Sequence, residues 1–218
     1  MTGSTTCRLG AVLAVLFILP TPAAWAHPHV AVTASAEVLY APDGKVTGVR
    51  HAWTFDEAYS AYITQGLDRN GDGKLTPDEL QGLAAENASS LAEFDYFTVL
   101  KANGAKQSFD APREPGMSFA NQELTLTFVL PLKKPANASK LLVLEVADPT
   151  YFVAFTIAAG EDAVKLAGAP RGCATTITRP KTLDVAQQQT LSEAFFQTLS
   201  TTSTFGAQFA SRAMVACP

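Results

Sequence analysis

The sequence predicts an α+β fold: an antiparallel β-sheet or sandwich with an inserted helix–loop–helix and C-terminal helices. Short runs in which apolar and polar residues alternate are separated by turns that contain glycine or proline, which is typical of antiparallel strands. A helical pattern interrupts these runs over about residues 56–93. Apolar residues return at helical spacing after Pro180, so the chain is expected to end in helices.

The first strands form a predicted hairpin over residues 30–40 and 46–55. A Pro-Asp-Gly turn at residues 42–44 separates the two runs. Asp56 is placed to cap a short helix that reaches about residue 67. Pro77 then stands where the first turn of a second helix tolerates proline, and that helix is expected to reach about residue 93. One face of the first strand is apolar or small: Val30, Val32, Ala34, Ala36, Val38 and Tyr40.

The second half of the chain is predicted to return to strands and then change to helix. Asn103-Gly104 is a strong hairpin signal between two short runs. The predicted strands cover residues 96–101, 105–109, 124–130, 141–146, 151–158 and 173–178. The residues at helical spacing are Leu183, Val185, Leu191, Phe195, Leu199, Phe205, Phe209 and Met214.

The first 26 residues are predicted to be a cleaved export signal. Arg8 precedes an apolar stretch at residues 9–20, and Ala24-Trp25-Ala26 has the small residues of a cleavage site. The stretch is shorter than the roughly 20 residues that span a bilayer. We expect a periplasmic mature chain without a membrane span, built as one domain over residues 27–218. An uncleaved N-terminal anchor is the alternative.

Charge and cysteine usage narrow the function classes. The net charge of −4 and the lack of Lys/Arg runs argue against a nucleic-acid partner. Removal of the signal removes Cys7 and leaves Cys173 and Cys217, a pair that in an oxidising compartment predicts a disulfide. A two-cysteine metal site is the alternative, but neither a CxxC spacing nor a nearby histidine supports it.

Residues 68–79 read Asp-Arg-Asn-Gly-Asp-Gly-Lys-Leu-Thr-Pro-Asp-Glu, with helical patterns on both sides. Oxygen-bearing residues fall where a twelve-residue calcium loop needs them, and Gly73 occupies the sharp turn at the sixth position. The loop therefore resembles an EF-hand; a solvated polar turn is the alternative. Because one such loop stands alone, we expect a structural ion; a calcium sensor is the alternative. The predicted calcium ligands are Asp68, Asn70, Asp72, the backbone carbonyl of Lys74, Thr76 and Glu79.

The three histidines suggest a second metal site at the mature N-terminus. Cleavage after Ala26 makes His27 the first residue, which places a free amine and two imidazoles, those of His27 and His29, within three residues. Nitrogen ligands of this kind suit nickel, zinc or copper. An exposed polar terminus is the alternative. His51 shares a strand face with Trp53 and is expected to be packed in the core about 20 Å from His29.

Several segments together resemble a known family. His27-Pro28-His29-Val30, Trp53-Thr54-Phe55-Asp56, the calcium-type loop, Phe94-Asp95-Tyr96-Phe97 and Asp148-Pro149-Thr150-Tyr151-Phe152 occur in this order. In this combination the chain resembles the periplasmic family catalogued as domain of unknown function 1007. Members are described as periplasmic components of ABC-type transport systems, often beside nickel/cobalt-type exporters or permeases. The resemblance implies metal handling in the periplasm and transfers no catalytic residue.

Three hypotheses follow. The leading one is a non-enzymatic periplasmic protein that is stabilised by calcium and serves nickel, cobalt, zinc or copper transport or homeostasis. The second is an interaction protein that docks a membrane permease, with calcium ordering the helix pair. The third is a copper-dependent redox enzyme with a histidine brace at His27. Other catalytic arrangements find no support, because a Ser–His–Asp set, a Cys–His pair and a phosphate loop are not evident in the sequence.

Overall fold

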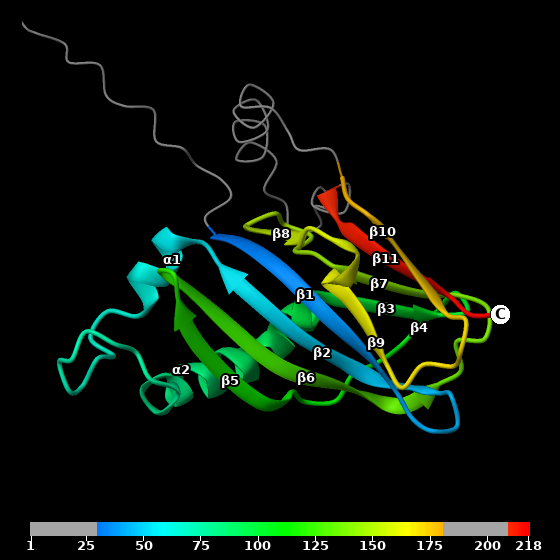
Figure 1. Cartoon of the computed structure of the whole chain (residues 1–218), viewed down its shortest axis with the longest axis horizontal. Coiled ribbons are helices and arrows are strands. Elements are labelled where there is room, and N and C mark those ends of the chain that lie inside the picture. The colour runs from blue at the N-terminus through cyan, green and yellow to red at the C-terminus, as the bar shows by residue number, and fades with distance from the viewer. Residues whose placement is uncertain (1–29, 181–208) are drawn as a thin grey trace, which may run out of the picture.

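The computed structural model describes residues 30–180 and 209–218. In this part of the chain two β-sheets and two α-helices form an α+β structure, and most strand pairs are antiparallel. The predicted fold class is therefore confirmed at this level. Residues 181–208, which include most of the predicted C-terminal helical pattern, lie outside the described residues. Figure 1 shows the sheets as two layers.

The first sheet has the strand order β5-β6-β2-β1-β8, and β9 also pairs with β1. The predicted hairpin is confirmed, because β1 and β2 pair antiparallel with Ala36 opposite His51. β8 and β9 instead run parallel to β1, and this was not predicted. The strands are β1 (Val30–Tyr40), β2 (Val46–Phe55), β5 (Arg113–Ala120), β6 (Glu123–Ala136), β8 (Val153–Ile157) and β9 (Val164–Ala167).

The second sheet has the order β10-β11-β7-β3-β4, with antiparallel pairs throughout. The prediction that Met214 lies in a helix is wrong, because Met214 lies in β11. Ser211, Ala213 and Val215 are buried in alternation while β11 pairs with strands on both sides, and period-two burial defines a strand. The strands are β3 (Thr98–Ala102), β4 (Ala105–Lys106), β7 (Leu142–Val146), β10 (Ala174–Thr178) and β11 (Ser211–Ala216).

The helical insertion contains α1 (Glu57–Ile63) and α2 (Pro77–Ser90), followed by the 3-10 turn η1 (Leu91–Phe97). A second 3-10 turn, η2 (Glu161–Ala163), precedes β9. α2 lies against β5 and β6, behind them in Figure 1. Leu80 of α2 is fully buried and belongs to the hydrophobic core, so the helix that follows the calcium-type loop is anchored in the core.

The core lies between the two sheets, where Trp53, Phe128, Leu100 and Leu144 are almost completely buried. Trp53 packs edge-on against Phe128 with ring centroids 4.9 Å apart. Aromatic pairs in this geometry add stabilisation beyond the area that they bury. The first sheet is therefore held in place by the packed core, and the helix–loop–helix begins directly after β2.

Candidate functional site

The helices on both sides of the loop begin with well-formed caps. The Asp56 carboxylate accepts a hydrogen bond from the Tyr59 N–H (2.9 Å) at the start of α1. Thr76 and Glu79 form a capping box at the start of α2, and Pro77 follows the cap as predicted. Side-chain oxygens thus bond amide groups that the helices leave unpaired, which fixes where each helix begins.

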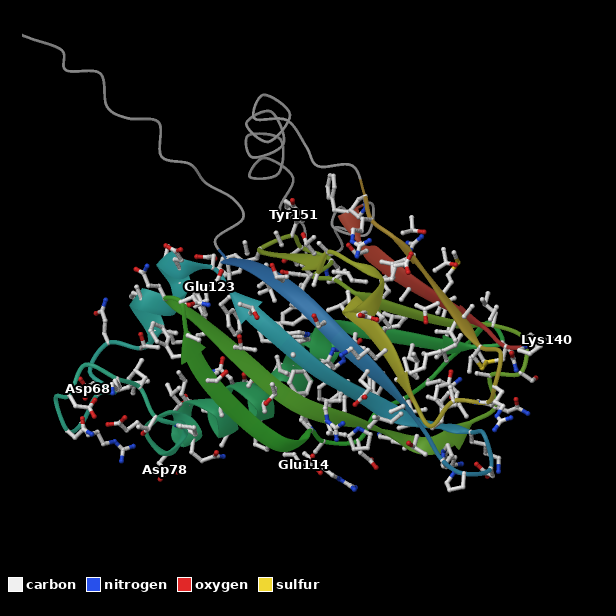
Figure 2. The ribbon with its side chains drawn as sticks, in the orientation of Figure 1. Asp68, Asp78, Glu114, Glu123, Lys140 and Tyr151 are labelled. Atoms are coloured by element: carbon white, nitrogen blue, oxygen red, sulfur yellow. A yellow bond between two sulfur atoms is a disulfide. The ribbon has the colours of Figure 1, made fainter. Side chains whose placement is uncertain are left out.

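Asp68 organises the first half of the loop. Its Oδ1 accepts hydrogen bonds from the N–H groups of Gly71 (2.8 Å) and Asp72 (3.2 Å), and its Oδ2 accepts one from Gly73 (2.9 Å). Gly71 and Gly73 have φ values of 68° and 76°, which glycine adopts without steric cost. The chain therefore curls around the Asp68 carboxylate. Figure 2 shows Asp68 on the loop that extends away from the sheets.

The next two oxygen-bearing side chains stabilise the same curl. Asn70 Oδ1 accepts from the Asp72 N–H (2.9 Å), and Asp72 Oδ1 accepts from the Lys74 N–H (2.8 Å). The Asn70 amide also donates to Asp72 Oδ2 at 3.1 Å. Three predicted ligands therefore lie within one short, exposed turn, and they offer the oxygen atoms that calcium prefers.

Glu79 closes the loop from its far end. Its Oε1 accepts from the Arg69 N–H (3.0 Å), and its Oε2 accepts from the Thr76 N–H (3.0 Å) and hydroxyl (2.8 Å). The hydrogen bond from the Thr76 backbone, followed by those from the Thr76 hydroxyl and Arg69, lowers the pKa of this carboxyl below its ordinary value. The side chain is therefore ionised at neutral pH, as a calcium ligand must be.

The donor set fits a calcium ion in chemistry, although Glu79 here bonds Thr76 and Arg69. Within residues 30–180 and 209–218, no three His, Cys, Asp or Glu side chains gather closely enough to hold a metal. The remaining predicted ligands are neutral oxygens, from Asn70, Thr76 and the Lys74 carbonyl. Calcium takes carbonyl, amide and water oxygens beside carboxylates, so the residue types are suitable.

Of the three histidines, His51 lies within the described residues. His27 and His29 lie outside the described residues, so the site predicted for them stays a prediction. His51 is fully buried, as expected for a packed core residue. Its ring stacks on Phe128 with centroids 5.0 Å apart, and its Nε2 lies 3.4 Å from Thr98 Oγ1. Burial lowers the pKa of His51 from 6.5 to about 3, so the imidazole is neutral near pH 7.

Hydrogen bonding also assigns the tautomer of His51. The Thr98 hydroxyl donates its only proton to the Tyr96 carbonyl at 2.8 Å, so toward His51 its oxygen acts as the acceptor. His51 therefore carries its proton on Nε2. His51 Nδ1 is buried without a partner among the described residues, and an imidazole enclosed in this way does not serve as an exposed metal ligand.

The predicted disulfide is present between Cys173 and Cys217. It joins the residue before β10 to the residue after β11, so it links these two paired strands covalently at the edge of the second sheet. None of the helices in the described ranges is long and apolar enough to cross a membrane.

Sequence reasoning did not assign a role to Phe94, Asp95, Tyr96 and Phe97. In the structure the last three have φ values of 50°, 57° and 45°, a left-handed conformation that residues other than glycine rarely adopt. No glycine marks this turn, so composition carried no signal. The available signal was the Phe-Asp-Tyr-Phe segment itself, which contributed to the family resemblance.

Comparison with known proteins gives two relatives and one family. An "Uncharacterized protein" of Haemophilus influenzae (strain ATCC 51907 / DSM 11121 / KW20 / Rd) is 25% identical over 196 residues, which cover 88% of this chain and 91% of the relative. An "Uncharacterized 15.5 kDa protein in trpE 3'region" of Spirochaeta aurantia is 32% identical over 85 residues, 39% of this chain and 61% of the relative. The family model "Protein of unknown function (DUF1007)" matches residues 12–217, and the chain therefore belongs to the DUF1007 family.

Proposed function

We propose that this protein is a periplasmic calcium-binding component that serves transition-metal transport or homeostasis and is not an enzyme. The observation that carries the calcium part is the curl of residues 68–73 around one carboxylate, with Asp68 accepting three backbone N–H groups. In the proposed site, Asp68, Asn70, Asp72, the Lys74 carbonyl, Thr76 and Glu79 hold the ion through oxygen.

The proposed ion is structural. When bound, calcium supplies a divalent charge that offsets the carboxylates of a short loop and joins the segment after α1 to the start of α2. Glu79 is followed by the fully buried Leu80, so a ligand at this position is linked directly to the core. A single loop outside the cytosol does not need high affinity, because extracellular calcium modules function with dissociation constants of roughly 10⁻⁴–10⁻³ M.

The periplasmic location and the transport role have separate support. The apolar stretch and the Ala24-Trp25-Ala26 site indicate export, and the Cys173–Cys217 disulfide suits an oxidising compartment. The transport role rests on the family resemblance and on His27 and His29, which bring nitrogen ligands for nickel, cobalt, zinc or copper to the mature N-terminus. The proposed partner is a membrane metal transporter or permease.

The calcium part is tested by thermal unfolding of the mature protein with and without calcium. Calcium should raise the melting temperature of the wild type, by a stabilisation of about 2.7 kcal/mol at a hundredfold excess over the dissociation constant. Glu79→Gln should lose most of this rise, because its side chain no longer offers an ionised carboxylate. Asp78→Asn is the matched control, since it removes the same charge from the neighbouring, exposed position of α2. Equal rises in wild type and Glu79→Gln would refute the assignment.

Metal analysis after mild chelation separates the transport role from the alternative of a calcium-ordered docking protein. Nickel, cobalt, zinc or copper retained by the mature protein, and lost in a His27→Ala/His29→Ala variant, would support metal handling at the N-terminus. Retention of calcium alone would favour the docking protein, for which the exposed rings of Phe94 and Phe152 are the supporting observation. Redox turnover with added copper would instead favour the histidine-brace enzyme.

A further inference from the structure

Four segments that carry the family resemblance or adjoin it meet at one end of the two sheets. β1 begins at Val30 opposite Val153, the first residue of β8. β2 ends at the same place, because Val32 pairs with Phe55. In the second sheet Thr98 pairs with Val146, so the turn before β3 and the loop after β7 also emerge there. We call residues 30–32, 53–57, 93–98 and 147–153 the aromatic end.

These segments are held together by direct contacts. Trp53 packs against Phe155 and Phe97, with ring centroids 5.0 Å and 6.4 Å apart, and Phe97 lies 5.3 Å from Phe155. The Ala147 N–H donates to the Phe97 carbonyl at 2.9 Å. The two sheets are therefore joined beneath the aromatic end by packed rings, which form a rigid base.

Two of the segments adopt an energetically unfavourable backbone conformation. Asp95, Tyr96 and Phe97 are left-handed in succession, and Tyr151 on the neighbouring loop has a φ of 62°. Each such residue costs roughly 1–2 kcal/mol, and strain of this kind concentrates where function requires a fixed shape. The bond from the Thr98 hydroxyl to the Tyr96 carbonyl, with His51 behind it, secures the first turn.

The second loop is secured by a buried carboxylate. Asp148 is 6% exposed, and it accepts hydrogen bonds from the backbone N–H groups of Thr150 (2.8 Å) and Val153 (3.0 Å). The Thr150 hydroxyl donates to the same carboxylate at 2.8 Å. These hydrogen bonds all go to the loop itself. Asp148 therefore fixes the shape of the loop and does not face a ligand.

Each of these two turns carries one large apolar ring that is about half exposed. Phe94 is 53% exposed and stacks on Phe97, with centroids 5.1 Å apart and planes 11° from parallel. Phe152, on the loop after β7, is 48% exposed. A ring that is already fixed in place loses little conformational freedom when a partner covers it, and aromatic side chains of this kind dominate binding at protein interfaces.

The charge of the aromatic end determines the kind of partner. Its four segments contain no Lys or Arg, and their exposed acidic residues are Glu57, Glu93 and Asp95, since Asp56 caps α1 and Asp148 is buried. A neighbouring cation, Lys106, lies 3.7 Å from the Asp95 carboxylate in an exposed pair, which contributes little. Anionic lipid and nucleic acid would be repelled, whereas a cationic protein surface would be attracted.

We propose that the aromatic end docks a cationic segment of a partner protein, whose apolar side chains pack on Phe94 and Phe152. The rigid rings provide the contact area, and Glu57, Glu93 and Asp95 attract the basic side chains around it. This surface lies outside residues 68–79 and requires no metal, so it stands whether or not calcium binds.

The test measures binding of three short peptides to the mature protein by backbone-amide NMR and calorimetry. One peptide contains lysine and leucine, the second glutamate and leucine in the same order, and the third lysine and serine. The lysine–leucine peptide should bind most tightly, shift the amides of residues 93–98 and 147–153, and weaken as salt is added. The other two should each bind at least tenfold more weakly.

Phe94→Ala should reduce the affinity for the lysine–leucine peptide at least tenfold without lowering the melting temperature by more than a few degrees. Tyr62→Ala is the matched control, because Tyr62 is also an exposed aromatic residue, 72% exposed, but lies on α1. Its removal should leave the affinity unchanged. Amide shifts confined to other residues, equal affinity of Phe94→Ala and wild type, or equal binding of the glutamate–leucine peptide would each overturn the proposal.

Discussion

The burial of His51 makes a specific prediction about acid stability. The folded protein holds the pKa of this histidine at about 3, compared with 6.5 for the ordinary side chain, because burial among Trp53 and Phe128 penalises the charged form. Between these two values the unfolded chain binds a proton that the folded chain does not. The free energy of unfolding must therefore decrease as the pH falls from 6.5 toward 3.

The size of the effect follows from the displacement of the pKa. One pKa unit corresponds to about 1.4 kcal/mol, so lowering the pH to 4.5, two units below 6.5, should remove about 2.7 kcal/mol through His51 alone. The loss approaches about 5 kcal/mol near pH 3, where it levels off. This is a large share of the 5–15 kcal/mol that is typical of folded proteins.

The assay is urea unfolding of the mature protein at pH 7 and pH 4.5, for wild type and His51→Phe, with calcium chelated throughout. Phenylalanine retains an aromatic ring but cannot bind the proton. Because other groups titrate equally in both proteins, the informative quantity is the difference between their losses of stability on acidification. Wild type should lose about 2.7 kcal/mol more than the variant. Equal losses in the two proteins would refute the reasoning.

Two further predictions concern stability at neutral pH. Ser60→Ala should lower the free energy of unfolding by about 1–3 kcal/mol, because the buried Ser60 hydroxyl accepts a hydrogen bond from the Leu124 N–H (2.9 Å). The control Ser89→Ala, at an exposed position, should change this free energy little. Chemical unfolding of both variants tests the prediction. Removal of the Cys173–Cys217 bond in a Cys173→Ser/Cys217→Ser variant should cost about 2–5 kcal/mol, measured against the oxidised wild type. Unchanged unfolding midpoints would contradict either expectation.

Local sequence signals predicted the local structure well. The β1–β2 hairpin follows from alternation around a Pro-Asp-Gly turn, and its observed register places His51 opposite Ala36. The Asn103-Gly104 turn joins β3 and β4 as predicted. These elements depend on neighbours in the chain, so their residues carry the necessary information.

Pairing between distant segments was not predictable in the same way. β8 lies parallel to β1, more than a hundred residues away in sequence, and nothing in its short apolar run specifies that partner. β5 was missed because Pro115 and Gly116 weaken its strand pattern, although a register irregularity accommodates them at the sheet edge. Met214 was assigned to a helix because apolar spacing near the C-terminus fits both periods.

The candidate site shows the same division. The ligand types of residues 68–79 were evident from their order in the chain, and the capping box at Thr76 and Glu79 agrees with the predicted start of α2. The aromatic end was not evident, because its segments are far apart in sequence and meet only through sheet pairing. Backbone strain at Asp95 likewise depends on tertiary contacts that composition does not reveal.

The central claim, that residues 68–79 bind calcium, is tested most directly by equilibrium dialysis of the purified mature protein against calcium. We predict that one calcium ion binds per chain. Half-saturation should occur at or below a free calcium concentration of about 10⁻³ M, the upper end of the dissociation constants of extracellular calcium modules. Failure to retain any calcium at millimolar free concentration would contradict the claim. So would a Glu79→Gln variant that binds the same number of calcium ions as the wild type with the same affinity.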